Sequence, residues 1–393
     1  MGLKLYRDAY FGLLAMGFSI MLSNGLSRAF LPILANQLNS TGILVGLVTS
    51  SWFVARAFVE LPSGFIASKI GKRKLIIGGF LLGVVGSLVC AFSNNIYMLI
   101  GGVAIWGFGS AFFFMSSTLL LFDICRSEER GKTMGSLYTA EEVGALLGAP
   151  IGGLLATVVG FSNVFFFSSS ILFLVFLLTI FSRNLRRADL ETHTSRTLNV
   201  REVLHGLKNW ELIAISFSNL SRMLIIQGLM LTIFELYLNN FLNLGVDLIG
   251  LVMGVRTGGI VFAALISGYL SNKIGTKPLL IGAFVAQAVG IYLYTLTQSF
   301  AYVAIVAILE GIGSGFVFIC LLVFFSDVIP SSLRNEGMGL YRTFQDVGGI
   351  IGPIFFIILY DLFNVYVPFL SAMFLLLVNA GLVFFVRRHH VEK

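Results

Sequence analysis

Long apolar stretches alternate with short polar segments along all 393 residues of the chain. A helix needs about 20 mostly apolar residues to cross a bilayer, and twelve stretches reach that length. The pattern predicts an all-α polytopic membrane protein with twelve transmembrane helices. The predicted spans are about 9–35, 42–68, 73–92, 97–123, 134–158, 163–183, 212–238, 246–272, 277–297, 301–326, 337–360 and 365–387.

The chain also repeats itself at a fixed offset of 204 residues. Gly64 returns as Gly268 and Asp123 returns as Asp327, and such matches keep one register from residue 46 to residue 352. Duplicated hydrophobic units are a common plan of secondary transporters, with the substrate site between the repeats. The repeat therefore predicts two six-helix bundles.

One long polar stretch sets the boundaries of these bundles. Residues 184–211 are rich in charged side chains and follow the sixth predicted span. We expect an N-terminal bundle at 1–183 and a C-terminal bundle at 212–393, joined by this linker. Part of the linker, at 200–212, has the pattern of an amphipathic helix that would lie on the membrane surface.

The basic residues indicate the orientation in the membrane. Twenty-one of the 26 lysines and arginines lie at the two termini, in the central linker and in alternate short loops, whereas the opposite loops hold none. Cytoplasmic loops of membrane proteins are enriched in Lys and Arg. We therefore expect a multi-pass protein of the cell membrane, with both termini and the linker in the cytoplasm.

The composition fits a bilayer location and argues against other classes. The chain is 57% hydrophobic and 11% charged, with a mean hydropathy of +0.93, whereas a soluble domain carries roughly a quarter charged residues. The net charge of +7 comes from the one-sided loops, so no nucleic-acid partner is expected. Three scattered cysteines form no disulfide framework, and no metal or cofactor is expected.

Two similar glycine-containing segments follow the second and eighth spans. Each has a glycine among basic residues, where it would allow a tight turn between helices. The basic side chains would anchor that turn at the inner headgroups. The residues are Gly64, Ser68, Lys69, Gly71, Lys72 and Arg73 in the first segment and Gly268, Asn272, Lys273 and Gly275 in the second.

These segments resemble motif A of the major facilitator superfamily, and the twelve spans, the repeat and the long linker match that family too. The resemblance covers nearly the whole chain and implies a secondary transporter that works by alternating access. Ser68 and Asn272 stand where the family usually has aspartate. The resemblance implies that this aspartate helps to lock the cytoplasmic side closed, and here only a weaker hydrogen bond can replace it.

The fifth span carries a stripe of small residues. Gly144, Gly148 and Gly152 are four residues apart on one helix face, where small residues let two helices approach closely. With Pro150 and Gly153, the pattern resembles motif C of the family's antiporters and favours export. Ordinary helix packing is the alternative interpretation.

Ionisable residues within spans are costly unless they are paired or hydrated, so each is a candidate functional residue. The resemblance implies that spans 1, 4, 7 and 10 line a central cavity, and these carry Arg28, Arg222, Glu235 and Glu310. Glu310 is the candidate for proton coupling, because its own helix offers no basic partner. Arg28 and Arg222 are candidates for binding an anionic group. The alternative is that these charges only pair with one another to hold helices together.

Spans two and eleven carry complementary charges. Arg56 and Asp346 lie about 18 and about 16 Å from the cytoplasmic ends of their helices. Glu60 and Arg342 lie about 12 and about 10 Å from those ends. We therefore expect an inner gate formed by the bridges Arg56–Asp346 and Glu60–Arg342. The alternative is two intrahelical pairs, each worth a few tenths of a kcal/mol.

The favoured function is proton-coupled export of an amphipathic or organic solute by a monomer. The expected partners are a small-molecule substrate, a proton or other coupling ion, and the lipid bilayer. Val103 replaces the fourth-span arginine typical of drug–proton antiporters, so uptake or exchange of a small organic anion is an alternative. A non-transporting receptor is the alternative from a different class. No nucleophile converges with a base, so no enzymatic activity is expected.

Overall fold

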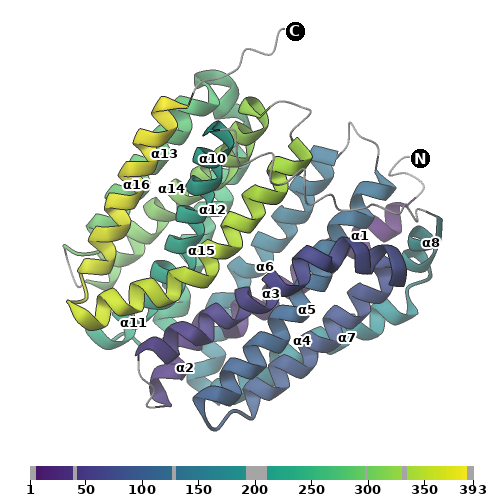
Figure 1. Cartoon of the computed structure of the whole chain (residues 1–393). Helices are drawn as coiled ribbons and strands as arrows, with labels where there is room; N and C mark the ends of the chain where they lie inside the picture. Colours follow the sequence, from purple (N-terminus) through teal and green to yellow (C-terminus); the bar gives the residue numbers. More distant parts are fainter. Residues whose placement is uncertain are drawn as a thin grey trace. The chain divides into compact units, whose positions relative to one another are not determined.

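The computed structural model describes residues 6–38, 42–125, 130–191, 210–296, 299–329 and 334–386, and these form helices joined by short connections (Figure 1). Within these residues, twelve helical segments are long and apolar enough to cross a membrane, which confirms the predicted fold class and number of spans. The first half of the sequence contains α1 (Arg7–Ser27), η1 (Arg28–Phe30), α2 (Leu31–Gln37), α3 (Gly42–Ile70), α4 (Lys72–Ala91), α5 (Ile96–Ile124), α6 (Arg130–Val159), α7 (Phe161–Phe181) and α8 (Arg183–Glu191). The second contains α10 (Trp210–Leu224), η3 (Ile225–Ile233), α11 (Phe234–Leu236), η4 (Tyr237–Phe241), α12 (Val246–Ile274), α13 (Thr276–Leu293), α14 (Phe300–Val328), α15 (Arg334–Leu362) and α16 (Val367–Phe385).

Large apolar side chains cover outer faces of these helices. Phe58 is 72% exposed, Leu178 is 60% exposed and Phe374 is 67% exposed. A water-soluble monomer rarely exposes so many large apolar groups, because contiguous patches of this kind drive association. The same side chains are well solvated by lipid tails, so their exposure fits a protein embedded in a bilayer.

The first and seventh spans depart from regular α-helix at corresponding places in the repeat. The 3₁₀ turn η1 separates α1 from α2, and Pro32 explains this break, since a proline ring clashes with the carbonyl group four residues earlier in a continuous α-helix. In the seventh span, η3 and η4 are π-helical, and Thr232 Oγ1 donates to the Gln227 carbonyl oxygen at 2.8 Å. Arg28 and Thr232 are equivalent in the repeat. Irregular turns of this kind are frequent at functional sites.

A single glycine joins α3 to α4, and another joins α12 to α13. Gly71 has φ +95° and Gly275 has φ +89°, a region that residues with a side chain rarely adopt. The next helix begins at the residue that follows each glycine. These turns lie within the two segments that resemble motif A.

The chain divides into two compact units. Val45–Ser50, near the start of α3, belong to the second unit, whereas Gly245–Gly254, before and at the start of α12, belong to the first. We call these two segments the exchanged turns. The three-part organisation predicted from the sequence stays a prediction. Residues 192–209, which hold most of the expected amphipathic helix, lie outside the described residues.

The exchanged turns are held by close backbone packing in both units. In the second unit, a Cβ atom on Gly46 would lie 3.0 Å from the carbonyl oxygen of Pro353. In the first unit, a Cβ atom on Gly250 would lie 2.6 Å from the carbonyl oxygen of Ala149. The two glycines are equivalent in the repeat, and so are Ala149 and Pro353. The same glycine-to-backbone contact therefore occurs twice.

Candidate functional site

Glu310 of α14 forms a buried ion pair with Arg256 of α12. The Nε atom of Arg256 lies 2.5 Å from Oε2 of Glu310, and a terminal guanidinium nitrogen lies 3.2 Å from Oε1. The side-chain amide of Gln287, from α13, donates to Oε1 at 2.9 Å. Both charged residues are buried. The sequence analysis looked for a basic partner on the helix of Glu310, whereas the structure provides one from a different helix.

The equivalent place in the first half of the chain holds two tryptophans. Trp52 is the repeat mate of Arg256, and Trp106 is the repeat mate of Glu310. The two indole rings are buried and meet edge-on, with their centroids 5.8 Å apart. An apolar pair thus fills the position that the ion pair fills in the second half. Because buried ion pairs are often replaceable by well-packed apolar residues, helix packing alone does not require these charges.

The two intramembrane arginines predicted to bind an anion both lie against aromatic rings. The Cζ atom of Arg28 lies 3.6 Å from the ring centroid of Trp52. The Cζ atom of Arg222 lies 4.9 Å from the ring centroid of Phe318, and its Nε donates to Asn219 Oδ1 at 3.2 Å. An aromatic ring stabilises a guanidinium group by about 0.5–2 kcal/mol without neutralising its charge. Such contacts suit a group that also interacts with a solute.

Glu235, the third intramembrane candidate, lies in the short α11 between the two π-helical segments. Its side chain is fully buried. The neighbouring Phe234 and Tyr237 both pack on Phe369, with ring centroids 6.4 and 5.2 Å apart. A buried carboxyl group within a span is costly to ionise unless it is paired or hydrated. Its burial keeps Glu235 a candidate for a functional role in the seventh span.

The four residues of the predicted inner gate are spread over both units. Arg56 lies beside Phe114, with Cζ 5.8 Å from the ring centroid. Asp346 is buried and Arg342 is half-buried. The side chain of Glu60 lies outside the described residues. Arg56 belongs to the first unit and Asp346 to the second, so the two bridges stay predictions.

The structure adds a buried carboxylate that the sequence analysis missed. Glu141 of α6 is only 6% exposed. A Cβ atom on Gly17 of α1 would lie 3.4 Å from its Oε1, so the carboxyl group lies against the bare backbone of α1. The charges of Glu142 and Arg56 also act on it. Glu141 lies three residues before Gly144, on the face of the glycine stripe, and that spacing could have identified it.

The glycine stripe of α6 packs directly on α1. Cβ atoms on its three glycines would lie 2.0–2.6 Å from backbone oxygens of α1, so no larger residue fits without a shift of the backbone. The stripe of α15 packs on α10 in the same way. The contacts are Gly144 with Phe18, Gly148 with Leu22 and Gly152 with Leu26 in the first half, and Gly348 with Leu220 and Gly352 with Leu224 in the second.

The other two residues of the motif C segment face α12. Pro150 contacts Gly254, where a Cβ atom would lie 2.3 Å from the proline Cγ. A Cβ atom on Gly153 would lie 2.5 Å from the carbonyl oxygen of Val246. The segment therefore packs on two helices at once, and its link to export stays a hypothesis.

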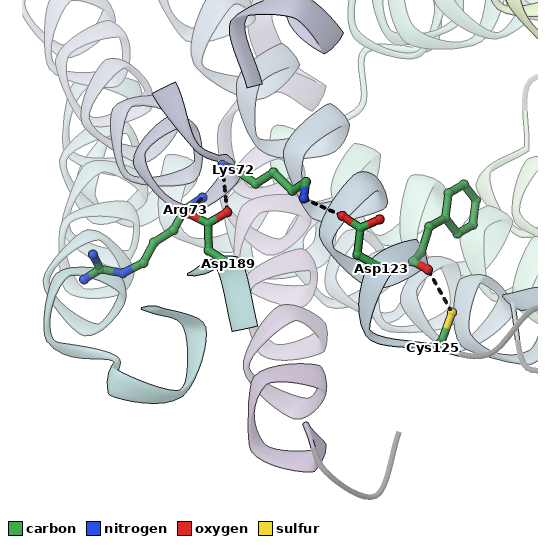
Figure 2. A network of polar contacts seen from close by, with 6 residues as sticks. Lys72, Arg73, Asp123, Cys125 and Asp189 are labelled. Carbon is green, nitrogen blue, oxygen red and sulfur yellow. Dashed lines mark hydrogen bonds and ion pairs between the residues drawn. The ribbon is translucent and has the colours of Figure 1, made fainter. Parts of the chain in front are cut away.

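A polar network surrounds the glycine turn between α3 and α4 (Figure 2). Asp189 of α8 accepts hydrogen bonds from the backbone N–H groups of Lys72, at 3.0 Å, and Arg73, at 3.3 Å. Its carboxylate thereby caps the N-terminus of α4. The Lys72 ammonium group forms an ion pair with Asp123 near the end of α5. The Arg73 guanidinium group donates to the last carbonyl oxygens of α7.

The second glycine turn repeats this network with fewer charges. Thr276 Oγ1 donates to Asp327 at 3.0 Å, and the Lys277 ammonium group donates to two carbonyl oxygens at the end of α16, at 2.7 and 2.9 Å. These residues are the repeat mates of those in the first network. The side chains of Ser68 and Asn272, where the family pattern has aspartate, lie outside the described residues.

These features define the class of protein. Secondary transporters typically have many membrane-spanning helices, internal repeats and buried charges within spans. The described part of this chain has twelve helices long and apolar enough to cross a membrane, a twofold set of equivalent contacts and buried ionisable groups within these helices. Within the described residues, no group of three or more His, Cys, Asp or Glu side chains could hold a metal ion.

Comparison with known families gives the same result. The model of the Major Facilitator Superfamily matches residues 13–230 and residues 215–393, so the chain belongs to this family of membrane transporters. Membership confirms the resemblance seen in the sequence. It also implies a small-molecule substrate and a location in the lipid bilayer.

The chain is similar to curated relatives over most of its length. It is 27% identical over 334 residues to the multidrug resistance protein MdtG of Salmonella choleraesuis (strain SC-B67). The aligned region covers 83% of this chain and 82% of the relative. The protein of the same name from Salmonella schwarzengrund (strain CVM19633) is 28% identical over the same shares of the two chains. The protein of that name from Salmonella typhi is 27% identical.

Proposed function

We propose that the protein exports an amphipathic or organic solute by alternating access, driven by a proton gradient. Family membership supports transport, and the name of the relatives, multidrug resistance protein, supports export. The transporter would act as a monomer in the cell membrane. Both termini and the segment 184–211 would face the cytoplasm, because the basic loop residues lie on that side.

The buried Arg256–Glu310 pair carries the proposal of proton coupling. The repeat-equivalent tryptophans make the same helix contact without charge, which supports a role for the ion pair beyond packing. Protonation of Glu310 would neutralise its carboxylate and weaken its hold on Arg256. The guanidinium group would then be available to reorganise the contacts of α12 with α14. This coupling would take the place of the fourth-span arginine that is Val103 here.

Transport by purified protein in proteoliposomes tests this proposal. The probe is a fluorescent amphipathic cation such as ethidium, and an imposed pH gradient supplies the driving force. We expect the wild-type protein to accumulate the dye against its gradient and a protonophore to abolish accumulation. Dye binding without flux in either direction would favour a receptor and overturn the proposal.

Two matched variants separate coupling from folding. Glu310→Gln should still bind the dye and exchange it downhill, but should lose accumulation driven by the pH gradient. Glu141→Gln removes another buried carboxylate and should keep that accumulation. If Glu310→Gln keeps pH-driven accumulation and Glu141→Gln loses it, the coupling site is Glu141 and the assignment to Glu310 is wrong.

Uptake or exchange of a small organic anion is the second candidate, and the positions of Arg28 and Arg222 against aromatic rings favour it. Under this alternative, Arg28→Gln and Arg222→Gln should weaken the binding of organic anions and leave the binding of cationic dyes unchanged. Under the export proposal the protein should move cationic dyes, and neither variant should show this selectivity for anions.

A further inference from the structure

The short helix α8 has two chemically different faces. Ser182 caps its first turn, with Oγ accepting a hydrogen bond from the backbone N–H of Leu185 at 3.3 Å. Leu185 and Ala188 are buried on one face, and α8 contacts α1, α4 and α5. Residues three, four and seven positions apart lie in one row along a helix. The opposite row, which we term the arginine face, consists of Arg183, Arg186, Arg187 and Leu190, and all four are exposed.

The arginine face brings three cations together at helical spacing. Arg183 lies in the first turn, where the helix dipole is positive and disfavours a cation. Arg186 and Arg187 follow it at three and four residues, the spacings at which like charges repel. The nearby carboxylate of Asp189 is directed at the backbone of α4. An anion outside the helix would relieve this repulsion.

The predicted membrane span that precedes α8 points to the kind of anion. The membrane-spanning α7 ends at Phe181, and Ser182 is the one residue between it and α8. Nine residues of helix extend about 14 Å, so the arginine face remains near the level of the headgroups. Phe181 and Leu190 are 77% and 71% exposed and supply apolar groups at the two ends of this face. A basic helix flanked by apolar groups fits an anionic lipid surface.

We propose that the arginine face of α8 binds the headgroups of anionic phospholipids in the cytoplasmic leaflet. The other side of α8 gives this binding a consequence. Asp189 caps the N-terminus of α4 beside the turn at Gly71, and Figure 2 shows its carboxylate directed at Lys72 and Arg73. Headgroups that hold α8 in place would therefore also hold this cap in place. The lipid charge would act on the segment that resembles motif A.

Fluorescence quenching in nanodiscs of full-length protein tests the site. A bimane label is attached to Leu190→Cys, because the native Cys90, Cys125 and Cys320 are buried. The discs contain either phosphatidylglycerol or phosphatidylcholine with brominated chains, at the same mole fraction in a non-brominated background. We expect phosphatidylglycerol to quench the label about twofold more strongly or better, because it gathers at the arginine face. Equal quenching by the two lipids would overturn the proposal.

Two double variants test whether α8 causes the preference for phosphatidylglycerol over phosphatidylcholine. Arg183→Gln with Arg186→Gln should abolish this preference. Arg7→Gln with Lys74→Gln removes the same number of exposed cytoplasmic-side charges outside α8 and should leave it intact. Loss in both double variants would point to net charge alone, and retention in the α8 variant would exclude the arginine face. Inorganic phosphate added to the wild-type discs should not compete, and competition would show a site for free phosphate instead.

Discussion

Arg256 and Glu310 are joined by two hydrogen bonds. Their repeat-equivalent residues in the first half of the chain, Trp52 and Trp106, instead form an edge-on aromatic contact. One duplicated framework thus holds an ion pair in one copy and an apolar pair in the other. Both pairs occur in one chain, so the tryptophan pair shows that this helix contact can form without charges. The ion pair is a property of the second half alone. It leads directly to a test of stability.

Removing one partner of the ion pair should destabilise the protein more than removing both. Glu310→Leu would leave the guanidinium group of Arg256 buried without its counter-ion, at a cost of about 3–5 kcal/mol. Adding Arg256→Leu should recover most of that loss, because an apolar pair fits the equivalent position. The midpoint of thermal unfolding in detergent measures both effects. Losses that simply add in the double variant would show that the two side chains act separately.

Enlarging the glycine stripe should disturb the contact between α1 and α6. A Cβ atom on Gly152 would lie 2.0 Å from the carbonyl oxygen of Leu26, so Gly152→Ala requires a backbone shift that costs about 1–3 kcal/mol. Gly101 is a control, since a Cβ atom there meets nothing within 4 Å. Gly101→Ala should stabilise its helix by about 0.5–1 kcal/mol. Equal unfolding midpoints for the two variants would contradict this difference.

The predicted inner gate should show coupling between spans two and eleven. We expect Arg56–Asp346 and Glu60–Arg342 to favour the state closed to the cytoplasm by about 1–3 kcal/mol each. Asp346→Asn should therefore shift the protein toward the state open to the cytoplasm and slow exchange. Adding Arg56→Gln should partly restore it, because no unpaired charge is then left behind. Exchange rates and spin-label distances between the cytoplasmic ends of the two helices report the effect, and strictly additive losses would indicate separate intrahelical pairs.

The predicted orientation can be tested with an impermeant thiol reagent on intact cells. A cysteine placed at Ser195, which lies outside the described residues, should be protected from reagent added outside. A cysteine placed at Asn94, in the exposed connection between α4 and α5, should react. The reason is that basic residues are confined to the loops on the side of Ser195. The reverse labelling pattern would invert the topology.

The spans could be predicted because hydrophobic length is a local property of the sequence. The partner of Glu310 could not, because it depends on which neighbouring helix presents a cation at the same height. The repeat did contain a signal, since Arg256 falls on Trp52 as Glu310 falls on Trp106. The sequence analysis considered partners for Glu310 on its own helix and among Arg28 and Arg222, and did not consider Arg256.

The cap on α4 was out of reach for a similar reason. In the sequence, Asp189 is one of several charged residues in a polar stretch, and nothing in its spacing sets it apart. Its role arises because α8 folds back against the start of α4, more than a hundred residues earlier in the chain. Glu141 could have been found from its place three residues before Gly144, on the face of the glycine stripe.

The exchanged first turns of α3 and α12 have one further consequence. The contacts of Gly46 with Pro353 and of Gly250 with Ala149 consist of backbone and apolar atoms. A contact without ionisable groups has no charge interaction for salt to screen. Neither an ion gradient nor a charged solute can act on these turns directly. Any force on them has to be transmitted along α3 and α12 from charged groups elsewhere.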